Sequence, residues 1–478
     1  MFSFVNKPKI LVDLNEELTH QLLQIKGEVP HWLSGTYCRN GPVNVAIDDL
    51  KNRHWFDGLA MLHAFKIDKG SIFYTNKFLR TQAHTEVFNN SSFNYLGFAT
   101  PFTLNWYEKV KKWLNFPRQP IISNANQNIL RINKRFVALG EKISQVMINI
   151  DTLNSLKAFD FPIKRDAECC WESTHPHDEV CAERYINYFT EFAETNFYLV
   201  YSLQGDQEQF QQIAKIPVSN PSYMHSFAVT ENFIILTEFP LILTNRLNTE
   251  LPFIDQFKWI PQKGTNFLVI DRKNGQLVGN YKTMAFFAFH HVNAFENEGK
   301  IHLDLICYED AQIISRLADH ARPTTELENY SVSRLVRFTL DFVSAEITSN
   351  ILFKKFNEFP CINPHYKQKN YQFVYLCDAR DTLLINEIRP LYKVNVQTKQ
   401  YLEWSEEGCY PGEPFFIKSP YAQKEDEGVV LSIVIDAEKY QSFLLILDAM
   451  SFKEICRAQV PHVIPAGMHG QFFENEAY

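Results

Sequence analysis

The sequence predicts an all-β protein that folds as a single domain over residues 1–478. Short apolar or alternating runs, which are typical of β-strands, recur at 135–139, 197–203, 233–237, 267–271, 301–307, 373–377, 429–435 and 443–448. Turn-rich stretches such as DRKNG at 271–275 separate the runs, and no Pro/Gly/Ser-rich linker divides the chain. Many short strands with regular turns fit a sandwich, a barrel or a propeller, and without a visible repeat period the runs do not choose among them.

One segment, 93–118, departs from the strand pattern. Within it, LNWYEKVKKWLNF at 104–116 places its apolar residues at helical spacing, with three lysines beside them. Two interpretations are open: a helix docked on the β core, or an interfacial helix with its aromatic residues in lipid and its lysines near headgroups. The residues that would form a membrane-facing patch are Phe98, Phe102, Trp106, Val110, Trp113 and Leu114.

The net charge and the aromatic content indicate which classes of binding partner to expect. The formal net charge is −8 and the sequence contains no basic stripe, which argues against a nucleic-acid partner. The chain has 40 Phe, 21 Tyr and 7 Trp. Both strand packing and an apolar ligand tunnel favour aromatic residues, and we assign most of them to strand packing.

The termini and the cysteines bear on location. The nine cysteines contain no C-x-x-C pair, which suits a reducing compartment. The first twenty residues lack the apolar stretch and cleavage site of a signal peptide, and no run of about 18 apolar residues could span a bilayer. We therefore expect a soluble, cytoplasmic protein, or one attached to a membrane surface.

Four of the fifteen histidines lie in local sequences that suggest a metal site. They are His175 in STHPH, His225 in SYMHSF, His290 in AFHHVNAFE and His469 in PHVIPAGMHGQ. The gaps of 50, 65 and 179 residues exclude a local metal finger or an HExxH helix, but they permit four distant strands to converge on one axis. Spacing alone favours the plainer role, because a histidine beside apolar residues is more often a hydrogen-bonded core side chain.

A longer series of motifs changes this balance. In order, the chain contains GTYCRNGP at 35–42, HWFDG at 54–58, MLH at 61–63, NAN at 124–126, ALGE at 138–141, HP at 175–176, MHSFAVTEN at 224–232, FHHVNAFE at 289–296, EFP at 358–360, GEP at 412–414, EDEG at 425–428, LDA at 447–449 and MHG at 468–470. Over nearly its whole length the chain resembles the carotenoid cleavage oxygenase family, and HWFDGLAMLH is most similar to the β-carotene oxygenase and retinoid isomerase branch.

The resemblance implies a seven-bladed β-propeller, with a helical and loop cap over its top face and Fe(II) on its axis. It implies that His175, His225, His290 and His469 bind the iron, in preference to the neighbouring His177, His291 and His462. It also implies that Glu141, Glu358 and Glu413 accept N–H bonds from three of the ligands and fix their tautomers. Four neutral imidazoles suit Fe(II) and leave two octahedral positions open. No acid–base residue is needed beyond the metal centre.

The implied reaction is cleavage by O2 of a conjugated C=C bond in a carotenoid or apocarotenoid, giving aldehyde or ketone products such as retinal. Two alternatives stay open on the same scaffold: a dioxygenase for stilbene-type phenylpropanoids, and a retinoid ester isomerohydrolase that consumes no O2. An apolar polyene or aromatic alkene is thus the expected substrate. Because carotenoids reside in membranes, the resemblance favours the interfacial interpretation of 93–118 and a peripheral membrane contact. One departure affects substrate alignment: Gly140 stands where related members commonly carry Thr or Ser.

Overall fold

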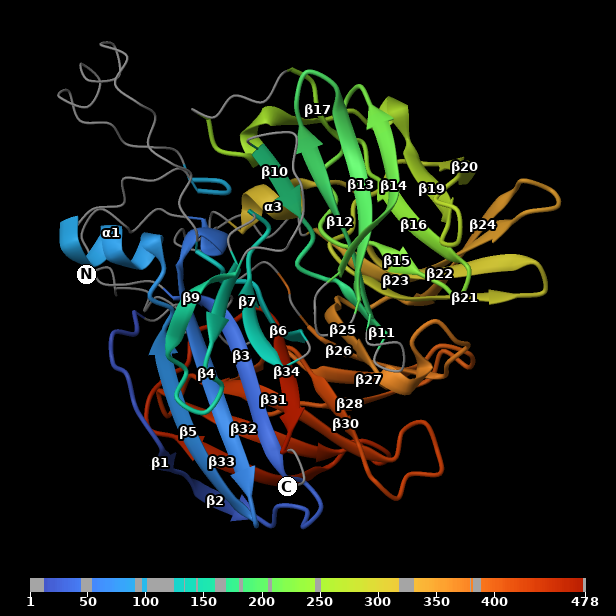
Figure 1. Cartoon of the computed structure of the whole chain (residues 1–478). Coiled ribbons are helices and arrows are strands. Elements are labelled where there is room, and N and C mark those ends of the chain that lie inside the picture. Colours follow the sequence, from blue (N-terminus) through green and yellow to red (C-terminus); the bar gives the residue numbers. More distant parts are fainter. Residues whose placement is uncertain are drawn as a thin grey trace, which may run out of the picture.

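The computed structural model describes residues 13–43, 54–90, 97–100, 124–132, 134–142, 145–159, 169–179, 184–204, 209–245, 251–317, 331–378, 380 and 388–475. Within these ranges seven antiparallel sheets form the blades of a ring, so the fold is a seven-bladed β-propeller (Figure 1). This confirms the all-β prediction and the propeller that the family resemblance implied.

Blades 1 to 3 come mainly from the first half of the chain. Blade 1 has the strand order β1 (Gln21–Leu22), β5 (Ser71–Phe78), β4 (Leu59–Asp68), β3 (Gly35–Val43) and β34 (Gly470–Glu474). Blade 2 consists of β6 (Asn128–Ile132), β7 (Arg135–Leu139), β8 (Gln145–Ile148) and β9 (Ser155–Phe159). Blade 3 consists of β10 (Cys169–Glu172), β11 (His177–Glu179), β12 (Arg184–Phe192), β13 (Asn196–Gln204) and β14 (Gln209–Val218).

Blades 4 to 7 follow in chain order. Blade 4 contains β15 (Ala228–Val229), β16 (Phe233–Glu238), β19 (Thr265–Asp271) and β20 (Leu277–Thr283), beside a separate hairpin of β17 (Leu241–Leu243) and β18 (Phe257–Trp259). Blade 5 contains β21 (His291–Asn297), β22 (Lys300–Tyr308), β23 (Ser333–Asp341) and β24 (Ile347–Phe353). Blade 6 contains β25 (Glu358–Ile362), β26 (Phe373–Cys377), β27 (Leu391–Asn395) and β28 (Tyr401–Trp404). Blade 7 contains β29 (Cys409–Pro411), β30 (Phe415–Lys418), β31 (Gly428–Asp436), β32 (Gln441–Asp448), β33 (Glu454–Val460) and β2 (Gln24–Gly27).

The two ends of the chain close the ring. The C-terminal strand β34 pairs with β3 of blade 1, and the N-terminal strand β2 pairs with β33 of blade 7. In Figure 1 the blue N-terminal strands accordingly lie beside the red C-terminal ones. Because each exchange satisfies backbone groups that a sheet edge would otherwise expose, the hydrogen bonds hold the ring closed and keep the inner strands in register.

Strand burial follows position in the blade. Every residue of β3 is buried, whereas β20, at the far edge of blade 4, is mostly exposed. Apolar side chains of neighbouring blades pack together, as in the cluster that joins blades 1 and 7 through Tyr37, Phe65 and Ile433. Each fully buried large apolar side chain contributes about 1.5–3 kcal/mol, so packing between blades makes the ring a rigid frame.

Helices are few among the described residues. They include the α-helices α1 (Gln82–Asn90) and α3 (Gln312–Arg316) and several short 3₁₀ helices. One of these 3₁₀ helices, η2 (Trp55–Asp57), precedes β4. No helix of the described residues is long and apolar enough to cross a bilayer. Of segment 93–118 the structure describes only 97–100, so Phe102, Trp106, Val110, Trp113 and Leu114 lie outside the described residues.

Candidate metal centre and its cavity

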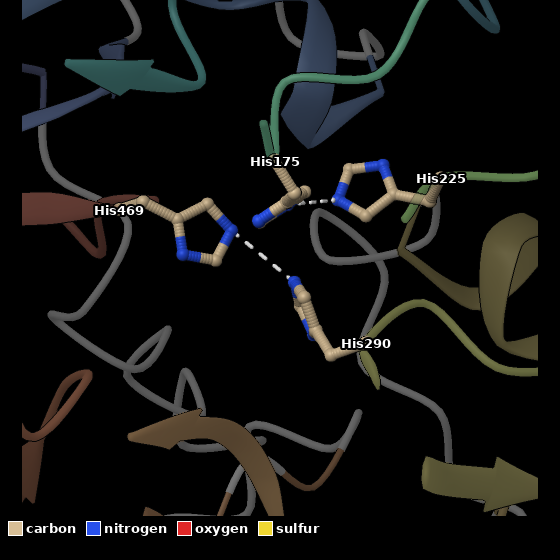
Figure 2. Close-up of side chains that lie close together, drawn as sticks. All are labelled: His175, His225, His290 and His469. Carbon is tan, nitrogen blue, oxygen red and sulfur yellow. Dashed lines mark hydrogen bonds between the residues drawn. The ribbon is translucent and has the colours of Figure 1, made fainter. Parts of the chain in front are cut away.

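Four histidines meet at the centre of the ring because each lies at the end of an inner strand. His175 sits between β10 and β11, and His225 precedes β15 by three residues. His290 directly precedes β21, and His469 directly precedes β34. These strands belong to blades 3, 4, 5 and 1, so convergence depends on closure of the whole propeller. The structure brings together all four histidines that the sequence predicted (Figure 2).

The rings point at one shared space. One nitrogen from each of the four histidines lies within 4.8 Å of the others. The Nε2 atoms of His175 and His225 are 3.0 Å apart, and those of His290 and His469 are 3.2 Å apart. Two imidazole nitrogens at right angles around one ion, each at a bond length of about 2.1 Å, would be separated by about 3.0 Å. The spacing therefore fits a shared metal ion.

Three buried glutamates accept a hydrogen bond from the outer nitrogen of a ligand candidate. The Nδ1 atom of His225 lies 2.6 Å from Glu141 Oε1. The same bond is 2.5 Å for His290 with Glu358 and 2.7 Å for His469 with Glu413. Glu141, Glu358 and Glu413 come from blades 2, 6 and 7. Each of the seven blades thus contributes one residue, either a histidine or a glutamate, to the centre.

The protonation pattern explains why these contacts favour a cation. Donation from Nδ1–H to a carboxylate leaves the lone pair on Nε2, facing the centre. Burial lowers the pKa of His175 well below 6.5, and the neighbouring imidazoles lower it further. Burial also lowers the pKa of His469, although Glu413 opposes the shift. Neutral rings whose lone pairs face one another repel unless a positive ion lies between them, and four imidazole donors suit a divalent transition metal.

Glu358 adds a negative charge beside the four histidines. Burial alone would raise the pKa of Glu358, but the imidazole of His290 and hydrogen bonds from His290, Phe359 and Tyr308 outweigh it. The pKa of this carboxyl therefore lies below its ordinary 4.5, and Glu358 is ionised at neutral pH.

The neighbouring histidines turn away from the centre and have other partners. The Nε2 atom of His177 lies 3.0 Å from the carbonyl oxygen of Phe227. His291 contacts the hydroxyl groups of Ser226 and Thr237, each at 2.8 Å. The structure therefore separates the predicted ligand from its neighbour in both the STHPH and the FHH motifs.

A cavity borders the histidines. Its empty volume is about 1380 Å³, part of which is open to solvent. Most of the lining surface is apolar. The ring centroid of Phe289 lies 5.6 Å from that of His225, and the ring centroid of Phe359 lies 5.4 Å from that of His469. The lining also includes the apolar residues Trp55, Phe56, Ile313, Ile433, Ile464 and Met468, and the polar or charged residues Arg39, Gln127, Tyr308, Glu358, Asp378, Arg380 and Arg389. An apolar ligand could thus lie next to the four histidines, in contact with aromatic rings.

Strained backbone shapes this wall. Phe359, a non-glycine residue, has φ +50°, and its N–H donates to Glu358 Oε2 at 2.8 Å. A positive φ costs such a residue about 1–3 kcal/mol, which the surrounding structure must offset. The strain places a ring against His290 and His469 directly after a glutamate that holds His290.

The sequence over this whole frame matches a known family. The family model described as Retinal pigment epithelial membrane protein matches residues 11–474. The chain belongs to the carotenoid cleavage oxygenase family. Members of this family are enzymes, and the resemblance seen in the motifs is confirmed.

Individual relatives cover almost all of the chain. The mitochondrial carotenoid-cleaving dioxygenase of Mustela putorius furo is 31% identical, over 94% of this chain and 93% of the relative. The beta,beta-carotene 15,15'-dioxygenase of Homo sapiens is 30% identical, over 96% of this chain and 93% of the relative. Among solved structures, a cobalt-substituted apocarotenoid oxygenase of Synechocystis is 25% identical with a TM-score of 0.84, covering 98% of both chains.

The departure from the family pattern at Gly140 has a structural counterpart. A Cβ atom at Gly140 would lie 3.1 Å from the Cα atom of Ala125, which is tighter than ordinary packing. Ala125 is itself buried and has φ +46°. The close approach of these two backbones therefore favours glycine here, next to the glutamate that holds His225.

The membrane-patch prediction was wrong for Phe98. This side chain is only 7% exposed and packs among aromatic residues, including Phe56, Tyr223 and Phe253. The backbone N–H of Phe98 donates to Asp57 Oδ1, which ties the residue to η2. Phe98 is a core residue, because its side chain packs into this aromatic cluster and does not join an exposed apolar stripe.

Sequence reasoning missed two tyrosines that contact the glutamates. The hydroxyl of Tyr223 donates to Glu141 Oε1 at 3.0 Å, and that of Tyr308 donates to Glu358 Oε1 at 3.1 Å. Tyr223 could have been found, because a residue two positions before His225 in an extended segment shares its face. Tyr308 has no such signal, since it is 18 residues from His290 and 50 residues from Glu358.

We predict that His54 makes stability depend on pH near the cavity wall. Its Nε2–H donates to Ile314 O at 2.8 Å, and its Nδ1 accepts from Phe56 N–H at 3.1 Å, which requires a neutral ring. Burial lowers its pKa below 6.5, against the opposing charge of Asp57. Above pH 6.5 both folded and unfolded states are neutral, and the stabilising contribution is complete. Below that value the unfolded chain takes up a proton first, so stability falls by about 1.4 kcal/mol per pH unit until the folded pKa is reached.

Thermal melts between pH 7.5 and 5.5 test this prediction. The wild-type melting temperature should fall more steeply with decreasing pH than that of His54→Asn. The same slope in both proteins would contradict the assignment.

Proposed function

We propose that this protein is a non-haem Fe(II) dioxygenase that cleaves a conjugated C=C bond of a carotenoid or apocarotenoid, giving aldehyde or ketone products. The observation that carries the proposal is the convergence of four Nε2 atoms beside a largely apolar cavity. The names of the relatives support the substrate class, because they describe carotenoid-cleaving and beta-carotene dioxygenases. The cobalt-substituted relative supports a transition-metal site in this fold.

The histidines and glutamates have separate tasks in this proposal. His175, His225, His290 and His469 would hold the iron, which supplies O2 activation when bound. Glu141, Glu358 and Glu413 orient three of the rings and keep their outer nitrogens protonated. With three carboxylates opposite a divalent ion, the charges nearly balance in a buried setting.

The cavity walls would position the polyene. The rings of Phe289 and Phe359 lie against ligand histidines, so a polyene in contact with them would be held beside the metal site. Such orientation lowers the entropic cost of bringing one double bond to the reactive centre. A bound polyene in contact with these rings would displace water from the site, which would protect reactive species from side reactions. The choice of bond would then depend on the length and shape of the apolar wall.

Anaerobic reconstitution tests the proposal directly. Purified protein is loaded with Fe(II), given O2 together with β-carotene, apocarotenals or resveratrol, and followed by oxygen uptake and mass analysis of products. We expect cleavage of a polyene with one O2 consumed per bond, and retinal among the products if the central bond is cut. Cleavage of resveratrol alone would identify a stilbene-type dioxygenase. Conversion of a retinyl ester without oxygen uptake would identify an isomerohydrolase.

We also propose a peripheral membrane contact through segment 104–116, from its sequence alone. Replacing both Trp106 and Trp113 with Glu should abolish co-sedimentation with liposomes, because two charges would enter the apolar face of an interfacial helix. The iron content should stay at the wild-type level, since these residues are far in sequence from the ligand motifs. Unchanged sedimentation of the double variant would defeat the proposal.

A further inference from the structure

The three histidine–glutamate pairs differ in what else holds the glutamate. Glu413 Oε2 accepts the backbone N–H of Gly470 at 2.9 Å. Glu358 accepts the backbone N–H of Phe359 at 2.8 Å and the hydroxyl of Tyr308 at 3.1 Å. Both carboxylates are therefore tied to main chain as well as to their histidine.

Glu141 lacks such a main-chain anchor. Its Oε1 atom accepts His225 Nδ1–H at 2.6 Å and the hydroxyl of Tyr223 at 3.0 Å, and the same hydroxyl lies 3.3 Å from Oε2. Among the described residues, Tyr223 and His225 are its side-chain donors, and no backbone N–H donates to this carboxylate. Apart from His225 itself, the phenol of Tyr223 is thus the group that orients the Glu141 carboxylate.

Tyr223 is well suited to act as a fixed support. Its side chain is only 1% exposed, and its backbone N–H donates to Leu241 O at 3.0 Å. Its ring packs against Phe98 with centroids 5.5 Å apart and stacks on Phe287 with ring planes 16° apart. A ring packed on several sides can hold its hydroxyl in one place, whereas a glutamate with three side-chain torsions cannot hold its own carboxylate.

We infer that Tyr223 is a positioning residue of the metal centre, which acts on the metal through Glu141 and His225. This inference rests on the proposed function, because it assumes that His225 binds a metal. The hydroxyl fixes the direction in which the Glu141 carboxylate faces His225, and thereby fixes the orientation of the His225 ring.

The difference between the three glutamates gives a graded expectation. Loss of the Tyr223 hydroxyl would leave His225 as the one hydrogen-bond donor to Glu141 among the described residues. Loss of the Tyr308 hydroxyl would leave Glu358 held by the Phe359 N–H as well as by His290. Tyr223→Phe should therefore weaken metal binding more than Tyr308→Phe does, although each substitution removes one hydroxyl from one tyrosine.

The test measures Fe(II) affinity of the metal-free full chain by anaerobic competition with a chelator, without turnover. Tyr223→Phe should bind Fe(II) about tenfold more weakly than wild type, at the lower end of the range for partners of metal ligands. Tyr308→Phe should show a smaller loss. The matched control is Tyr371→Phe. This variant loses a buried hydrogen bond, 2.6 Å long, from the Tyr371 hydroxyl to Asp304, and neither residue belongs to the metal centre. It should melt at a lower temperature but keep wild-type affinity.

A double-mutant cycle tests the route through Glu141. In a Glu141→Gln background, Tyr223→Phe should cause little further loss of affinity, because the two residues act in one chain of contacts. Equal losses in the two backgrounds would overturn the inference, as would wild-type affinity in Tyr223→Phe or equal losses in Tyr223→Phe and Tyr371→Phe. A wild-type chain that binds no metal would instead refute the proposed function, and this inference with it.

Discussion

Replacing His225 with alanine is expected to remove bound iron and abolish turnover while the propeller stays folded. The substitution deletes one of the four nitrogens at the centre, namely the Nε2 atom of His225, which lies 3.0 Å from Nε2 of His175. It also leaves Glu141 as a buried carboxylate whose remaining donor is Tyr223. We expect the loss of affinity to exceed the roughly 10–100-fold that follows when an outer partner of a ligand is removed.

Metal analysis of the purified variant and an anaerobic Fe(II) titration provide the measurement. His302→Ala is a suitable control, because His302 is a half-buried histidine that contacts Thr339 on blade 5 and lies outside the metal centre. The control should retain iron and activity. Near-normal iron and turnover in His225→Ala would refute the ligand assignment, whatever the substrate proves to be.

The cluster of four histidines was predictable because these histidines lie in distinctive motifs. Residue spacing alone could not have selected them, since gaps of 50, 65 and 179 residues fit many structures. Choices between adjacent histidines also came from the family pattern. The structure gives their physical basis: the backbone turns between neighbours, so that His290 faces the centre while His291 contacts Ser226 and Thr237.

Strands were easier to predict than their arrangement. The runs at 135–139 and 373–377 coincide with β7 and β26, because apolar and β-branched residues mark buried strands locally. The number of blades had no local signal. Blade 1 contains β1 and β34, which come from opposite ends of the chain, and the hairpin of β17 and β18 interrupts the strands of blade 4. The sequence therefore has no regular repeat period.

Contacts made across the fold were the hardest to predict. Phe98 precedes an amphipathic segment and was assigned to its apolar stripe, yet it packs against Phe56 and Tyr223. Tyr308 reaches Glu358 from a strand of a different blade. Such contacts depend on how blades pack together, which periodicity within one segment does not encode.

Glu358→Gln is expected to weaken Fe(II) binding by roughly 10–100-fold and to lower stability, because an amide carries none of the negative charge of this carboxylate. Three donors converge on its two oxygens: His290 Nδ1–H at 2.5 Å, Phe359 N–H at 2.8 Å and the Tyr308 hydroxyl at 3.1 Å. Glutamine can place its oxygen where Oε2 receives His290 and Phe359, and its NH2 group can donate to the Tyr308 oxygen, but every one of these bonds then becomes neutral. Hydrogen bonds to a charged group contribute about 1.5–3 kcal/mol each, whereas neutral ones contribute about 0.5–1.5 kcal/mol.

The two effects can be separated by comparing affinity with thermal stability. Glu238→Gln is a matched control, since Glu238 accepts the Tyr198 hydroxyl at 3.0 Å without contacting a ligand histidine. Its melting temperature should fall while its Fe(II) affinity stays unchanged. Glu358→Gln should show both a lower melting temperature and a weaker Fe(II) affinity. Excess Fe(II) should restore part of its turnover, because the four histidine nitrogens remain and only the orientation of His290 and the charge beside it are altered. If Glu358→Gln instead bound Fe(II) as tightly as wild type, the carboxylate would serve the fold alone, and the charge balance argued for the centre would have to come from elsewhere.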